Sequence, residues 1–261
     1  MKISIVIVNY NGRVDLERCL ESLREGVRAA HETIVVDNGS TDGSVAALAR
    51  WPEVRVVENG ANLGFARATN AGIRASAGEA LLLLNNDTVV PPAAIDRLLE
   101  ILESRPEVAV VGPRLVDASG RAELSFGRMI GPLNEWRQKR LGRSDLVDQL
   151  TRREHSPDWV SGACLLVRRA DAEAVGLLDE RFFLYTEDVD FCASIRARGR
   201  RILFTPAVEI VHLRGRSGAA APRATAEAYR RSRIAFYEKH HPAWVPLLKL
   251  YLAFTASSTA G

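Results

Sequence analysis

The stretch from Ala80 to Val90 constrains the fold more than any other part of the chain. Residues 80–84 are five consecutive apolar residues, which is typical of a strand buried on both faces in a parallel sheet covered by helices. Asn85, Asn86 and Asp87 follow directly. Ligands in open α/β sheets bind beyond the carboxyl ends of strands, so Asp87 is well placed to hold a metal or a phosphate-bearing ligand. A strand-end turn, in which Asn and Asp bond their own backbone, is the plainer alternative.

Apolar runs and helical periodicity alternate along most of the chain. Helices are expected from Pro91 through Glu103 and, rich in arginine, over 222–240. Strands are expected at 3–8, 33–36, 54–57, 108–111, 159–167, 202–204 and 208–211. The repeated strand–helix pattern predicts an α/β fold with a mostly parallel, Rossmann-like sheet flanked by helices. Residues 114–158 lose this periodicity, and such a segment usually carries specificity.

Composition is that of a globular protein in a reducing compartment. The chain has 261 residues, of which 47% are hydrophobic, and its three scattered cysteines read as small buried side chains. The opening apolar run is too short for a signal peptide. No segment reaches the ~20 apolar residues of a spanning helix, and 243–256 contains Pro246 and Lys249. We expect a cytoplasmic protein that contacts the inner membrane face through its basic C-terminal part.

Positive charge is concentrated between Arg196 and Arg233. This region holds ten arginines against two glutamates, a local charge of about +8. It suggests an anionic partner, which a membrane surface or a diphosphate ligand satisfies. No aromatic-interleaved motif or Cys/His finger accompanies the charge, so we expect no nucleic acid. The dinucleotide fingerprint G-x-G-x-x-G is also absent after the first strand, which argues against a nicotinamide or flavin enzyme.

Four further sites are candidates for chemistry or for close approach of a ligand. Asp37 repeats the pattern of a carboxylate at a strand's carboxyl end. Glu187, Asp188 and Asp190 follow an aromatic cluster and open a helix, where dipole stabilisation of ~0.3–1 kcal/mol each is the alternative interpretation. His212 ends a strand, where a lone histidine is more often a surface residue. Gly64 allows the backbone to approach a ligand closely.

Several motifs together resemble family 2 glycosyltransferases, and in particular the rhamnosyltransferase-like bacterial branch. The resemblance runs in order from residue 1 to about residue 240. It rests on Asn9-Tyr10-Asn11, the Asp37–Ser44 turn, Asn62-x-Gly64-Phe65-Ala66 with Asn70 and Gly72, the tripeptide ending in Asp87, the stretch Asp179–Asp190, and His212-x-x-Gly215-x-Ser217.

This resemblance implies the GT-A fold, a divalent cation (Mn²⁺ or Mg²⁺), a nucleotide-sugar donor and inversion at the anomeric carbon. By the same resemblance, Asp87 and His212 hold the metal, and Asp188, with Glu187 as competitor, supplies the catalytic base. The implied nucleotide-sugar-binding residues are Asn9, Asn11, Asp37, Asn62, Gly64, Phe65, Ala66, Asn70, Asn86 and Arg214.

One position departs from the family pattern. Asn85 stands where the first acid of the D-x-D motif is expected, so this loop offers the cation one certain carboxylate. Mg²⁺ and Mn²⁺ accept one or two carboxylates together with diphosphate oxygens and water. We therefore expect the donor and the cation to bind together.

The expected organisation follows from these assignments. Residues 1–113 form a nucleotide-sugar-binding half, 114–218 an acceptor and catalytic half of the same domain, and 219–261 a helical segment that can associate with a membrane. The leading reaction is rhamnosyl transfer from dTDP-rhamnose to a hydroxyl of a cell-surface glycan or lipid-linked acceptor. The alternatives are a sugar nucleotidyltransferase, for which 9–12 lacks the usual Arg- and Lys-containing loop, and a non-enzymatic module that binds polyanions.

Overall fold

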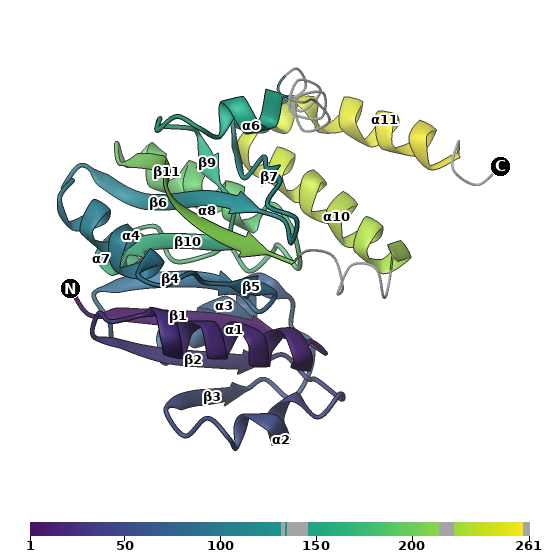
Figure 1. The fold of residues 1–261 in the computed structure, drawn as a ribbon. Helices are drawn as coiled ribbons and strands as arrows, with labels where there is room; N and C mark the ends of the chain where they lie inside the picture. The colour runs from purple at the N-terminus through teal and green to yellow at the C-terminus, as the bar shows by residue number, and fades with distance from the viewer. Residues whose placement is uncertain (132–133, 135–145, 214–221, 258–261) are drawn as a thin grey trace.

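The computed structural model describes residues 1–131, 134, 146–213 and 222–257. Its centre is a nine-stranded sheet in the order β3-β2-β1-β4-β10-β6-β11-β5, with β7 paired to β6 (Figure 1). The strands are β1 Ile3–Asn9, β2 His31–Asp37, β3 Val54–Glu58, β4 Ala80–Asn85, β5 Thr88–Val89, β6 Val108–Val116, β7 Ala122–Glu123, β10 Cys164–Arg168 and β11 Arg201–His212. A separate two-stranded sheet joins β8 Phe126–Gly127 to β9 Trp159–Val160.

Helices cover both faces of the large sheet, as the sequence predicts. They are α1 Arg13–Gly26, α2 Ser44–Leu48, α3 Phe65–Arg74, α4 Ala94–Glu103, α6 Leu146–Leu150, α7 Arg169–Ala174, α8 Glu187–Ala197, α10 Pro222–His240, the 3₁₀ turn η1 Pro242–Trp244 and α11 Val245–Ser257. None of the described helices combines the length and apolar character needed to span a bilayer.

The side chains of β4 point alternately to the two faces of the sheet, and each face has its own hydrophobic core. Leu82 and Leu84 face a core shared with α1 and α4, while Leu81 and Leu83 face a core shared with α3 and α8. All four side chains are at most 2% exposed, because helices cover both faces. The uninterrupted apolar run therefore belongs to the central strand that it predicts.

The mostly parallel sheet predicted from the sequence is confirmed, with β10 lying antiparallel between β4 and β6. Two expectations about elements need correction. The strands expected at 202–204 and 208–211 are one strand, β11, whose register against β6 shifts between Thr205 and Glu209. Helix α4 begins at Ala94 instead of Pro91, since Ala93 adopts φ 61° and donates its amide to the carbonyl of Gly26 at 2.8 Å.

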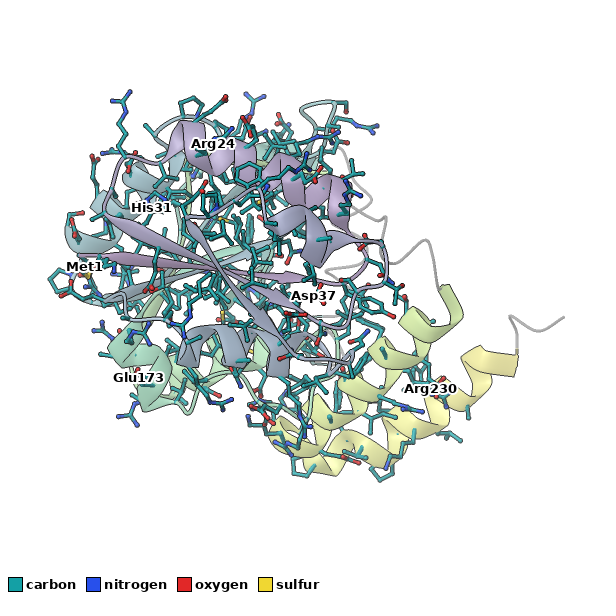
Figure 2. The ribbon with its side chains drawn as sticks, turned by 90° about the horizontal axis from the view of Figure 1, so that it is seen from below. Met1, Arg24, His31, Asp37, Glu173 and Arg230 are labelled. Carbon is teal, nitrogen blue, oxygen red and sulfur yellow. The ribbon has the colours of Figure 1, made fainter. Side chains whose placement is uncertain are left out.

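The C-terminal helices pack on the domain through a small third core. Its buried members are Phe182, Val189, Phe236, Tyr237 and Leu248. Helices α10 and α11 lie outside the main sheet and its covering helices (Figure 1). Figure 2 shows Asp37 at the same end of the molecule as the helix of Arg230, with Met1 at the opposite end. The expected boundary at residue 113 falls inside β6, so both halves share one sheet.

We predict that Phe236→Ala weakens this third core strongly. Phe236 is fully buried, and removing a buried aromatic side chain typically costs about 3–5 kcal/mol. Leu250→Ala is the matched control, because Leu250 is 54% exposed and its loss should change stability by no more than ~0.5 kcal/mol. Urea unfolding with hydrogen exchange of the α10 amides measures both. Equal losses in the two variants would contradict this packing of α10.

Candidate active site

The carboxyl ends of β1, β2 and β4 meet at one edge of the sheet. Asn9 pairs in register with Asp37, and the neighbouring Val8 pairs with Asn85. The Asn86 side-chain amide donates to Asn9 Oδ1 at 2.7 Å, and Asn9 Nδ2 donates to Ser40 Oγ at 3.1 Å. Asn9, Asp37 and Asn86, which the sequence places in one binding site, therefore lie together.

Asp37 is held in a tight turn at this edge. Its Oδ2 accepts hydrogen bonds from the amides of Gly39 (3.1 Å) and Ser40 (2.9 Å), and its Oδ1 lies 3.5 Å from Asn9 Nδ2. Asn11, at φ 52°, accepts a 2.7 Å hydrogen bond from the amide of Thr41. The turn orients the polar groups of two strand ends toward one another. A strand-end turn and a ligand-binding edge are therefore compatible interpretations of Asp37.

Gly64 packs against the backbone of Phe183, on the side where a ligand was expected to approach. A Cβ at Gly64 would lie 2.6 Å from the carbonyl oxygen of Phe183, and the amide of Phe65 donates to that same oxygen at 2.6 Å. Gly64 also has φ +85°, which favours glycine. The expectation of close approach is correct, but the approaching group is the backbone just before Glu187 and Asp188.

The neighbouring positions divide between this loop and the core. Asn62 Oδ1 accepts from Asn38 Nδ2 at 2.9 Å and from the amide of Gly64 at 3.1 Å. Ala66 is fully buried in the core under α3. Asn70, 1% exposed, exchanges hydrogen bonds with the backbone of Leu178 and donates to Glu180. These two side chains therefore act through packing and positioning in this structure.

Asp87 and His212 come together from β-segments far apart in sequence. The amide of Leu213 donates to the Asp87 carbonyl at 2.8 Å, and His212 pairs in register with Thr88. His212 Nε2 lies 3.3 Å from Asp87 Oδ1, and Nδ1 lies 3.1 Å from Glu123 Oε2. Glu123, on β7, is absent from the sequence-based site because no motif marks residues 114–158.

The charge of this cluster is shared between one imidazole and two carboxylates. Burial lowers the pKa of His212, but the adjacent carboxylates of Asp87 and Glu123 outweigh it and raise that pKa to about 9. His212 is accordingly an imidazolium near neutral pH without a bound cation. A metal that binds its nitrogen must displace that proton.

The donor atoms of Asp87 and His212 fit a divalent cation that a diphosphate also coordinates. Asp87 Oδ1 is buried and makes no well-aligned hydrogen bond with any described residue. Among residues 1–131, 134, 146–213 and 222–257, no group of three His, Cys, Asp or Glu forms a complete metal cage. Asp87 and His212 would hold the ion, and diphosphate oxygens and water would complete its coordination, as Mg²⁺ and Mn²⁺ favour.

The acid pair begins α8 after a strained turn. Tyr185 and Thr186 have φ 68° and 65°, an unusual conformation for residues other than glycine and one that clusters at functional sites. Asp188 accepts hydrogen bonds from the amides of Gly162 (2.9 Å, to Oδ2) and Val189 (2.8 Å, to Oδ1). Glu187 is buried, and its Oε2 has no hydrogen-bond partner among the described residues.

These environments separate the two carboxyl groups chemically. Burial, and then the charge of Asp188, raise the pKa of Glu187 well above its usual range. Burial also raises the pKa of Asp188, but two backbone hydrogen bonds act against it. Burial therefore disfavours ionisation of Glu187 more strongly than that of Asp188, whose carboxylate has two backbone donors.

Asp188 also lines a cavity of about 310 Å³. The cavity wall includes the aromatic side chains of Trp159, Tyr185 and Tyr229. Asp188 is half-buried, so its carboxylate can reach a molecule in this cavity, whereas Glu187 is 6% exposed. A larger cleft of about 480 Å³, lined by Arg114, Arg152 and other residues, contains none of the predicted site residues.

Helix α10 holds the acid-bearing segment in place. Ser232 Oγ donates to the carbonyl of Leu184 at 2.8 Å, while Lys239 Nζ and His240 Nε2 contact the buried Asp190 at 2.8 Å and 2.6 Å. Four described arginines of the region 196–233 form ion pairs with acidic side chains. The pairs formed there are Arg196–Asp158, Arg200–Asp171, Arg201–Glu107 and Arg231–Glu227. Arg214, predicted to bind the donor, lies outside the described residues.

Comparisons with known proteins agree with this geometry. Residues 4–175 match the sequence model described as glycosyl transferase family 2. An N-acetylglucosaminyl-diphospho-decaprenol L-rhamnosyltransferase of Mycobacterium tuberculosis is 33% identical over 92% of this chain and 85% of its own length. A low-salt glycan biosynthesis hexosyltransferase of Haloferax volcanii is 28% identical over 80% of this chain and 66% of its own length.

Two solved structures share the fold. A mannosyltransferase from Pyrobaculum calidifontis, in complex with GDP-Man and Mn²⁺, superimposes with a TM-score of 0.64 at 21% identity, over 95% of this chain and 68% of that one. TarS of S. aureus, residues 1–349, gives a TM-score of 0.61 at 17% identity, over 92% and 66% of the two chains. Both are similar in architecture, which confirms the predicted GT-A arrangement.

We predict that Gly64→Ala is more damaging than Gly60→Ala. Both glycines have positive φ, +85° and +70°, but Gly64 combines it with ψ 167°, a region that is essentially restricted to glycine, so the conformational cost of alanine is also higher there. Only Gly64 would place its Cβ against backbone, that of Phe183, while nothing lies within 4 Å at Gly60. Chemical denaturation should show the larger loss for Gly64→Ala. Equal losses would mean that the contact with Phe183 is not tight.

Proposed function

Since the chain belongs to glycosyl transferase family 2, as a rhamnosyltransferase-like member, we propose that it transfers rhamnose from dTDP-rhamnose to an acceptor hydroxyl with inversion. The acceptor is a lipid-linked or cell-surface glycan. The observation that supports this proposal is the presence of two acidic sites, one where Asp87 lies beside His212 and one where Asp188 lines a cavity. The rhamnosyltransferase relative supports the choice of sugar.

The strand-end edge binds the donor. Asn9, Asp37 and Asn86 form a hydrogen-bonded set at the ends of β1, β2 and β4, and this set contacts the nucleotide. Asp87 and His212 lie next along this edge and would hold the cation. A bound divalent cation supplies Lewis-acid neutralisation of the negative charge that develops on the leaving nucleotide.

Asp188 activates the acceptor. A carboxylate that carries the charge of the pair can take the proton of an acceptor hydroxyl as that oxygen bonds to the anomeric carbon. Two backbone hydrogen bonds hold the carboxylate in one orientation, and the cavity gives the acceptor access to it. Glu187 is buried, and its raised pKa favours the neutral form. It therefore adds no second negative charge beside the base.

We predict that Asp87→Ala weakens donor binding in a metal-dependent way. The wild-type protein should bind dTDP-rhamnose more tightly in Mn²⁺ than in EDTA, and the variant should lose most of that difference because one carboxylate ligand is gone. Isothermal calorimetry measures both affinities. The same affinity for the wild type in EDTA and in Mn²⁺ would contradict the role given to Asp87.

We predict that Asp188→Asn and Glu187→Gln differ in kind. Asp188→Asn should leave the donor Kd nearly unchanged and reduce the single-turnover rate by about 10²–10⁴-fold, the usual contribution of general-base catalysis. Glu187→Gln, isosteric with the neutral acid, should keep most of the rate. A collapse of rate in Glu187→Gln with near-normal turnover in Asp188→Asn would reverse the assignment.

The pH profile gives a further check on the same base. A general base acts only when deprotonated, and burial raises the pKa of Asp188. Activity should therefore be full above that raised pKa and fall as the pH drops through it, at a pH above the ~4 of an ordinary aspartate. An acid limb at or below pH 4 would contradict the environment described for Asp188.

We further propose that α11 rests on an anionic membrane surface. Trp244, Leu247, Leu250 and Tyr251 are 47–56% exposed, and peripheral binding needs a second, electrostatic anchor, which basic residues of α10 such as Arg230 supply. Vesicle co-sedimentation should show stronger binding to anionic than to neutral vesicles, with Leu247→Asp weakening both. Equal partitioning onto the two vesicle types would remove the electrostatic part of this proposal.

A further inference from the structure

One wall of the cavity beside Asp188 is built by the β8–β9 pair. Phe126 pairs with Val160, and Gly127 pairs with Trp159. Arg128 follows β8 directly and lines the cavity together with Trp159 and Ile130. No motif in the sequence distinguishes Arg128, and the family resemblance does not include it.

Three hydrogen bonds fix the backbone around Arg128. The amide of Asp158 donates to the carbonyl of Gly127 at 2.9 Å, and the amide of Met129 donates to Asp158 Oδ2 at 2.7 Å. Between them, Trp159 Nε1 donates to the carbonyl of Arg128 at 3.0 Å. The main chain that carries the guanidinium is therefore rigid, which lowers the entropic cost of using that group to bind a ligand.

The charge of Arg128 is uncompensated within the part of the chain that the structure describes. Its side chain is exposed and forms no ion pair or hydrogen bond with any residue of the described ranges. Asp158, the acid that orders this segment, is already paired with Arg196 at 2.9 Å. A guanidinium at a cavity wall without an internal partner is suited to an anionic ligand, and its planar fork matches phosphate oxygens.

The other walls suit a sugar. Trp159 is held by its hydrogen bond to the Arg128 carbonyl, and Tyr185 and Tyr229 meet edge to face at 5.8 Å. The apolar faces of a sugar ring pack against aromatic rings, and a few polar groups then set its orientation. Asp188, in the same cavity, is available for one hydroxyl of that sugar.

The wall of the cavity is tied to the segment that precedes α11. Ile130, which lines the cavity, accepts a 2.9 Å hydrogen bond from His241 Nε2 through its carbonyl. His241 directly precedes η1 and the exposed apolar side chains of α11. The cavity thus combines a carboxylate, aromatic walls and a cation, and its wall at Ile130 is hydrogen-bonded to the residue before η1.

We propose that Arg128 binds the phosphate of a glycosyl-diphospho-lipid acceptor, whose sugar reaches Asp188 and whose lipid runs toward α11. This rests on the proposed function and deepens it by assigning the acceptor class to a residue of this chain. The acceptor hydroxyl oxygen bonds to the anomeric carbon while the bond from that carbon to the donor diphosphate oxygen breaks. The proton passes to Asp188, and the acceptor's own phosphates keep all their bonds.

The test compares two acceptors that share a sugar. One is N-acetylglucosaminyl diphospho-farnesol, and the other is the neutral octyl N-acetylglucosaminide. Arg128→Gln should raise the KM for the diphospho acceptor roughly 10–100-fold, the usual value of a charged hydrogen bond, and leave the KM for the neutral acceptor and the donor Kd unchanged. Arg128→Lys should recover part of the loss. Arg198→Gln, an exposed arginine at the opposite end of α8 from Asp188, should behave as wild type.

Other outcomes overturn the inference in separable ways. An equal rise in KM for both acceptors would make Arg128 part of a steric wall, and a weakened donor Kd would place it on the donor side. Reduced binding of Arg128→Gln to anionic vesicles without acceptor would identify a lipid headgroup as the phosphate source.

A binding measurement keeps the inference independent of turnover. Calorimetric titration of the diphospho acceptor without donor should give a weaker Kd for Arg128→Gln than for wild type, and equal values would refute the role of Arg128. Absence of transfer to either acceptor, with that difference in Kd retained, would instead count against the proposed function.

Discussion

Burial of β4 on both faces determines where the functional groups lie. Leu81 to Leu84 are covered by helices on both faces of the sheet. The polar residues that follow them, Asn85, Asn86 and Asp87, therefore lie beyond the covered part of the strand, at the edge of the sheet. The parallel partners β1 and β2 end at the same level, with Asn9 opposite Asp37. The binding edge is therefore a consequence of core packing.

A second constraint joins this edge to Glu187 and Asp188. The Phe183 carbonyl contacts Gly64 and Phe65 at the start of α3, while α10 holds Leu184 and Asp190 from the other side. The segment that presents Glu187 and Asp188 is thus clamped between the donor loop and the C-terminal helices. This clamping accounts for the left-handed conformations at Tyr185 and Thr186, which isolated residues of these types rarely adopt.

Much of this site could be predicted from sequence, because local patterns encode it. The run 80–84 indicates a buried strand, which β4 confirms, and carboxylates after strands predict that Asp37 and Asp87 lie at one edge of the sheet, where the structure places them. Local patterns do not encode the antiparallel entry of β10 or the contact of Gly64 with Phe183, since both depend on residues about 80 or more positions away. The same limit applies to Glu123 and Arg128, which lie in a segment without periodicity. They can be identified as candidates only once the fold places Glu123 beside His212 and Arg128 in the cavity with Asp188.

The central claim is that the donor with its cation and the acceptor base occupy different sites. A crystal structure with a nucleoside diphosphate and Mg²⁺ tests it most directly. The account predicts the ion at about 2.0–2.1 Å from an oxygen of Asp87, close to His212, with the nucleotide against Asn9 and Asp37 and the cavity of Asp188 free of both. A cation bound between Glu187 and Asp188, or a nucleotide inside the Trp159 cavity, would contradict the account.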